Sequence, residues 1–175
     1  MEVLPIEILL ALVVVAGLAG MVDAIAGGGG LIALPALLWA GLPPVQALAT
    51  NKLQGTFGTF TASLNFIRRG EIELGRLRIP VLMTFLGSAA GTLAVQRLGS
   101  ALLEQIVPLL LIAFALYFLF SPRIGDQDAH HRISHGAFAL LIGFSVGFYD
   151  GFFGPGTGTF FAAAFVLLLG YNLRR

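Results

Sequence analysis

Long hydrophobic stretches recur along the chain, separated by short polar or glycine-rich segments. Residues 79–95 carry no charge, and residues 101–120 are nearly as apolar. A helix needs about twenty such residues to cross the hydrocarbon core of a bilayer. Pro80 suits the first turn of the first of these helices, and Pro108 predicts a kink in the second. Both stretches are therefore predicted to be transmembrane helices.

The remaining hydrophobic stretches are shorter, more polar or interrupted. Residues 8–40 are broken at a run of glycines and are a candidate for a discontinuous or re-entrant helix, whereas residues 45–67 are long enough to span but only weakly hydrophobic. Residues 135–149 and 158–171 flank another glycine-rich break. The predicted fold class is an all-α, polytopic transmembrane bundle with an internal repeat and Gly-rich broken or re-entrant helices.

The composition agrees with this prediction. Hydrophobic residues make up 57% of the chain and charged residues 11%, against about 25% charged residues in soluble domains. The acidic N-terminus lacks the basic region of a cleaved signal peptide, so the first stretch is expected to be a retained helix. The net charge of +1 and the absence of a basic, aromatic-rich run argue against nucleic acid as a partner. The absence of cysteine excludes disulfides and thiolate metal sites.

The arginines suggest an orientation. Arg68, Arg69, Arg76 and Arg78 make the 68–78 loop the most basic, so we expect it to be cytoplasmic in a multi-pass cell-membrane protein. If residues 8–40 and 45–67 each cross once, the N-terminus is cytoplasmic as well.

A sequence pattern occurs twice. Gly20-Met21-Val22-Asp23 returns 127 residues later as Gly147-Phe148-Tyr149-Asp150, and each copy leads into a glycine-rich break, an apolar run and a glycine turn. Chance matches between glycines are the alternative, but the same order of features in both copies favours duplication. Residues 1–134 would form the first repeat, and residues 135–175 the start of a second, incomplete one.

Three charged residues fall inside predicted hydrophobic helices: Asp23, Lys52 and Asp150. A charge at membrane depth normally faces a partner or an aqueous cavity. The two aspartates, each just before a glycine break, could cap the following half-helix or pair with Lys52, or they could titrate during transport. Lys52 could instead extend to the membrane surface.

The polar strip around Lys52 and the two breaks together predict an anion site. Amide and hydroxyl groups flank the ammonium group, and each break exposes backbone N–H groups at the positive end of a half-helix. A flexible hinge or close helix packing would also explain the glycines. Neither break matches a P-loop or a dinucleotide-binding pattern. The predicted substrate-binding residues are Thr50, Asn51, Lys52, Gln54, Gly28, Gly29, Gly30, Gly156, Thr157 and Gly158, with Asp23 and Asp150 setting the charge.

No catalytic set or cofactor site is predicted. His130, His131 and His135 lie near Asp126 and Asp128, and this cluster fits a solvated loop better than a metal site. A nucleophile paired with a base is not evident, so we expect no enzyme activity.

With these motifs identified, the sequence resembles the sulfite exporter TauE/SafE family of bacterial membrane transporters. The resemblance implies a helical transporter of two related halves that moves sulfite, organosulfonates or similar small anions, as an exporter, by alternating access. Members are typically longer, so we expect this chain to be truncated at its C-terminus, and a non-transporting regulatory or assembly role is the alternative. The sequence leaves homo-oligomer formation open. The motifs that carry the resemblance are residues 23–30, 41–44, 49–52 and 149–158.

Overall fold

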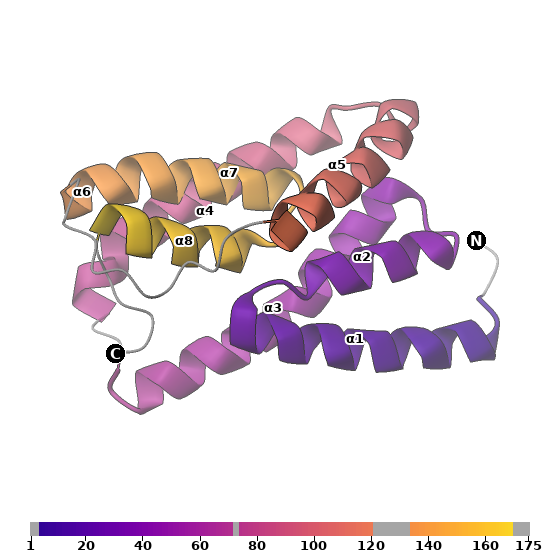
Figure 1. The fold of residues 1–175 in the computed structure, drawn as a ribbon, viewed down its shortest axis with the longest axis horizontal. Coiled ribbons are helices and arrows are strands. Elements are labelled where there is room, and N and C mark those ends of the chain that lie inside the picture. The colour runs from indigo at the N-terminus through magenta and orange to yellow at the C-terminus, as the bar shows by residue number, and fades with distance from the viewer. Residues whose placement is uncertain (1–3, 72–73, 121–133, 170–175) are drawn as a thin grey trace.

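A computed structural model describes residues 4–71, 74–120 and 134–169, and these residues contain helices and turns but no strand. This confirms the all-α fold class. The helices, arranged as in Figure 1, are α1 (Ile6–Ala26), α2 (Gly30–Trp39), α3 (Pro44–Arg68), α4 (Leu74–Gln96), α5 (Ser100–Phe120), α6 (His135–Phe138), the π-helical turn η1 (Ala139–Gly143), α7 (Phe144–Phe152) and α8 (Thr157–Leu169).

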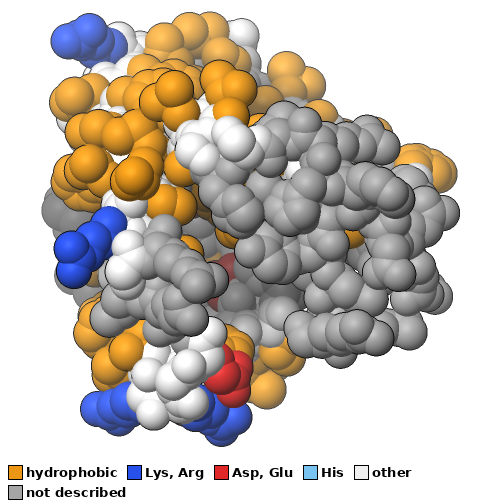
Figure 2. Space-filling view, turned by 90° about the vertical axis from the view of Figure 1, so that its left-hand side faces the viewer, with side chains coloured by type: hydrophobic (Ala, Val, Ile, Leu, Met, Phe, Trp, Pro, Cys, Tyr) orange, Lys and Arg blue, Asp and Glu red, His pale blue; other side chains and the backbone are white. Residues whose placement is uncertain are grey.

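Three helices in the described part of the chain are long and apolar enough to cross a membrane: Ile6–Ile25, Leu77–Gln96 and Ser100–Tyr117. Many of their large hydrophobic side chains point outward, as Val13, Phe85 and Leu109 do. On the face shown in the space-filling view, hydrophobic side chains cover much of the described surface (Figure 2). Such a surface is stable in a bilayer, because lipid tails are as apolar as these side chains and their contact carries no hydrophobic cost.

The first glycine break reverses the chain. α1 ends at Gly27, whose φ of 67° is left-handed and costs glycine little. α2 then folds back along α1, so closely that a methyl group at Gly29 would collide with the backbone oxygen of Ala19. Residues 8–40 therefore do not make a single broken crossing: α1 is long enough to cross alone, and α2 is a half-length helix that returns, as a broken or re-entrant segment does.

The direction of α3 corrects the predicted topology as well. Gln54 donates a hydrogen bond to the Ala16 carbonyl oxygen, and a methyl group at Gly58 would lie 3.5 Å from the Gly20 oxygen. Ala16 of α1 is thus next to Gln54 of α3, and Gly20 is next to Gly58. The residue numbers increase in the same direction along both helices, so α1 and α3 run parallel. The N-terminus of α1 and the basic end of α3 consequently lie at opposite ends of the bundle. The expectation that both face the cytoplasm was wrong, since it counted the α1–α2 hairpin as a single crossing.

A second hairpin runs the other way. α6, η1 and α7 form one nearly continuous helix, and α8 folds back after a break that contains Gly154 and Gly156, both with positive φ. α7 is parallel to α4, which returns in the direction opposite to α3 (Figure 1). The α7–α8 hairpin is therefore inverted relative to the α1–α2 hairpin.

Glycines allow α4 and α7 to pack backbone against backbone. Methyl groups at Gly87 and Gly91 would collide with the backbone oxygens of Phe144 and Phe148, and one at Gly151 with that of Ser88. Small residues spaced four apart are the usual means of close helix packing in membranes. This contact holds the second hairpin against the α3–α4 pair.

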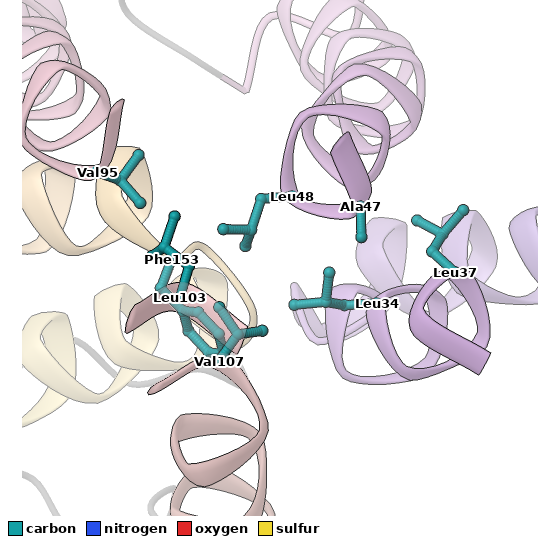
Figure 3. Close-up of a cluster of buried hydrophobic side chains, with 8 residues drawn as sticks. All are labelled: Leu34, Leu37, Ala47, Leu48, Val95, Leu103, Val107 and Phe153. Atoms are coloured by element: carbon teal, nitrogen blue, oxygen red, sulfur yellow. The ribbon is translucent and has the colours of Figure 1, made fainter. Parts of the chain in front are cut away.

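A hydrophobic core lies where both hairpins meet the longer helices (Figure 3). The core joins α2, α3, α4 and α5 to the second break, where Phe153 is almost fully buried. It fixes the ends of α2 and α7 relative to one another and so positions the two breaks. The buried side chains are Leu34, Leu37, Ala47, Leu48, Val95, Leu103, Val107 and Phe153.

Candidate substrate site between the two helix breaks

The two glycine breaks meet in the interior of the bundle. A methyl group at Gly27 would collide with the Cα atom of Gly158, and one at Gly30 would lie 3.1 Å from the Cα atom of Pro155. Only glycine permits this approach of two backbones. The Tyr149 hydroxyl donates a hydrogen bond to the Pro155 carbonyl oxygen and so fixes the second break.

A cavity of about 640 Å³ opens beside the contact between the breaks. Its volume is within the range of small-molecule sites. Helices α1, α3, α4, α7 and α8 all contribute to it, so residues far apart in the sequence come together. The lining includes Asp23, Gly27, Gly30, Asn51, Lys52, Thr56, Thr59, Ser88, Asp150, Gly154, Gly156, Thr157 and Gly158.

Lys52 and Asp150 form an ion pair across the cavity. The Lys52 ammonium donates a hydrogen bond to the Asp150 carbonyl oxygen and lies 3.8 Å from Asp150 Oδ2. The side chains are 29% and 40% exposed, which leaves the pair accessible from the cavity. The prediction that an intramembrane charge faces a partner is confirmed for these two residues.

Each aspartate also accepts a hydrogen bond from a residue at the start of the half-helix that follows its own break. The Gly29 N–H group donates a 2.7 Å hydrogen bond to Asp23 Oδ1, just before α2 begins. The Thr157 hydroxyl, at the first residue of α8, donates a 3.0 Å bond to Asp150 Oδ1. The carboxylates thus lie at the positive ends of the two half-helix dipoles, where negative charge is stabilised. The pairing interpretation is correct for Asp150. Its carboxylate contacts a side-chain hydroxyl of α8 and not a backbone N–H group, so the capping interpretation stays a prediction for this residue.

Asn51 stands out because it is polar and only 7% exposed. Its Oδ1 atom has no hydrogen-bond partner in the described structure. A methyl group at Gly30 would lie 3.1 Å from Asn51 Nδ2, so the amide is held tightly between α3 and the first break. An unpaired buried amide oxygen is costly.

Two predicted substrate residues lie elsewhere. Thr50 and Gln54 line a separate, mostly apolar pocket beside α1, and Gln54 is engaged with the Ala16 carbonyl oxygen. Their predicted role in substrate binding stays a prediction. At the first break, Gly30 lines the cavity, whereas Gly29 is bonded to Asp23 and neither Gly28 nor Gly29 is part of the lining.

The structure adds Ser88 of α4 to the site. Its hydroxyl lies 3.5 Å from Asp150 Oδ2, and Thr92 one turn further donates to the Gly151 carbonyl oxygen. In the sequence, Ser88 belongs to a run of small residues that indicates helix packing alone, so nothing there pointed to the cavity. Its role depends on the parallel contact of α4 with α7.

The predicted absence of a metal site stays a prediction. Among the described residues, no group of three or more His, Asp or Glu side chains could hold a metal ion. His130, His131, Asp126 and Asp128 lie outside the described residues, and so does the side chain of His135.

Comparison with known proteins identifies the family. The chain matches the family described as "Sulfite exporter TauE/SafE" over residues 12–175. The chain belongs to this family. No solved structure matches it.

Three relatives support the assignment to a membrane transporter family. The chain is 49% identical to a Haemophilus influenzae protein named "Probable membrane transporter protein", over 96% of the chain and 66% of the relative. It is 50% identical to the "Probable membrane transporter protein YfcA" of Escherichia coli K12, over 92% of the chain and 60% of the relative. A Sinorhizobium protein, "Probable membrane transporter protein ORF9", is 46% identical over 99% of the chain and 66% of the relative. The chain thus spans 60–66% of the length of these relatives.

Proposed function

We propose that this chain moves a small sulfur-containing anion, sulfite or an organosulfonate, out of the cell across the cytoplasmic membrane. The observation that carries this proposal is the cavity at the meeting point of the two breaks. It contains Lys52, the only lysine of the chain, beside the N-terminal ends of α2 and α8. A tetrahedral oxyanion would take the Lys52 ammonium from Asp150 and accept hydrogen bonds from the Thr157 hydroxyl and the Asn51 amide.

The arrangement of the hairpins supports alternating access. The two hairpins enter from opposite ends of the bundle and touch at their breaks, as the discontinuous helices of inverted-repeat transporters do. The touching glycines, Gly27 and Gly158, would act as a fixed point about which the hairpins rock. In this proposal residues 1–134 form one repeat and residues 135–175 begin the second.

Flux measurements test the proposal. Purified protein in proteoliposomes is given radiolabelled methanesulfonate, a compact anion that stays ionised at every pH used. Wild-type protein should exchange it across the membrane, and Lys52→Met should reduce exchange to the level of empty liposomes. Lys52→Arg should bind poorly, because the planar guanidinium differs in shape from an ammonium group.

Arg97→Met is the matched control, because it removes a positive charge that does not line the cavity. It should leave the exchange rate unchanged. Normal exchange by Lys52→Met would show that the anion site lies elsewhere. A wild-type protein that binds methanesulfonate without moving it would favour the non-transporting alternative.

A further inference from the structure

The cavity carries more negative than positive charge. Of the described residues that line it, Asp23 and Asp150 are acidic and Lys52 is basic. With all three ionised, the net charge is negative before any substrate enters. An additional anion at membrane depth would raise the negative charge further, which is unfavourable in a medium of low dielectric constant. Anion binding therefore requires a compensating positive charge.

The groups that would attract the anion are already engaged. Asp150 holds Lys52, and the Thr157 hydroxyl at the start of α8 is directed to Asp150 Oδ1. The Asp150 carboxylate thus occupies the place beside Lys52 and Thr157 where the proposed anion would bind. Displacing it in the charged form would leave a carboxylate without its partners inside the membrane, which is costly. A neutral Asp150 removes this cost.

We propose that Asp150 takes up a proton when the anion binds, so that the anion and the proton cross the membrane together. This inference rests on the proposed function. A proton from the aqueous phase binds Asp150 Oδ2 and removes the charge that attracts the Lys52 ammonium. The ammonium keeps its hydrogen bond to the Asp150 carbonyl oxygen and donates another of its three N–H groups to a substrate oxygen. On the other side of the membrane both ions leave and the Lys52–Asp150 pair forms again. No covalent bond other than the O–H bond is made or broken.

The surroundings favour Asp150 over Asp23 as the proton carrier. Asp23 Oδ1 is already engaged by the Gly29 N–H group, which can only donate and cannot accept from a protonated acid. Asp150 faces the hydroxyls of Ser88 and Thr157, which can accept as well as donate and so can serve a protonated acid. The other titratable groups near Asp150 are Lys52 of α3, Asp23 of α1 and Tyr149 of α7, and α4 and α8 contribute only hydroxyls.

Calorimetry counts the protons directly. Methanesulfonate is titrated into purified protein in buffers of different ionisation enthalpy, with choline as the only added cation. The slope of the binding enthalpy against ionisation enthalpy gives the protons taken up, which should be about one per anion. Affinity should fall about tenfold for each pH unit over the range in which one proton is taken up with the anion. Asp150→Asn should bind with little pH dependence and take up no proton.

Glu104→Gln is the matched control, since Glu104 is an exposed acid of α5 that does not line the cavity. It should keep the wild-type proton count. Binding without proton uptake by the wild type, unchanged uptake by Asp150→Asn, or binding that requires Na⁺ in place of a proton would each overturn the inference. If Asp150→Asn does not fold, the wild-type count still decides whether a proton binds together with the anion. Absence of binding at every pH would overturn the proposed function and this inference together.

Discussion

Lys52 of α3 and Asp150 of α7 are 98 residues apart in the sequence, yet the ammonium group of one donates to the backbone oxygen of the other. The same ammonium group lies 3.8 Å from the Asp150 carboxylate. The pair therefore links α3, which follows the first hairpin, to α7, the first helix of the second hairpin.

Removing one member of this pair should cost stability, and removing both should restore it. Lys52→Met leaves Asp150 without its cationic partner, at an expected cost of about 1–3 kcal/mol. The double variant Lys52→Met/Asp150→Asn strands no charge and should unfold near the wild-type temperature, although it should not transport. Thermal unfolding in detergent measures both. A single variant as stable as the wild type would show that the pair does not hold the hairpins together.

Gly27 should tolerate no side chain, because its φ is 67° and the Gly158 backbone faces it. We expect Gly27→Ala to destabilise the protein by at least about 2 kcal/mol, from left-handed strain and the lost backbone contact. Gly17→Ala is the control, since nothing lies within 4 Å of the added methyl group in the middle of α1. It should be neutral or stabilising by about 0.5–1 kcal/mol. Equal effects of the two variants would contradict the contact between the breaks.

The α4–α7 contact should be equally intolerant of larger residues. A methyl group at Gly151 would collide with the Ser88 backbone oxygen, so Gly151→Ala should separate the helices and lower the unfolding temperature. At Gly136 of α6 the same change meets nothing within 4 Å and should have little effect. The ratio of folded to aggregated protein in size-exclusion chromatography gives a second measurement. A stable Gly151→Ala protein would mean that the two backbones are further apart.

The two ends of the α1–α3 pair should be labelled from opposite sides of the membrane. The chain has no cysteine, so single cysteines can be introduced freely. Cysteine at Gly70 should resist an impermeant thiol reagent in intact cells, because the arginines around it favour the cytoplasm. Cysteine at Glu7, at the start of α1, should react. Labelling of both positions from the same side would be incompatible with a hairpin at the first break.

Much of this protein follows from its sequence. The hydrophobic stretches and the scarcity of charge are enough to predict a helical membrane protein, because only helices satisfy the backbone within lipid over such lengths. The glycine runs mark both breaks, since few other residues adopt the conformations that a reversal needs. The rarity of intramembrane charge singles out Asp23, Lys52 and Asp150 before any fold is known.

The relation between these parts depends on the tertiary structure. A glycine run marks a break without giving the direction in which the chain continues, so the reversal between α1 and α2, and with it the side of the N-terminus, is not evident from the sequence. Residues Thr50, Asn51, Lys52 and Gln54 are close in sequence but point to different sides of α3, because a helix turns about 100° per residue. Ser88 joins the cavity only because glycines bring α4 against α7. The hydrophobic pattern shows which segments lie in the membrane, whereas packing decides which of their faces meet.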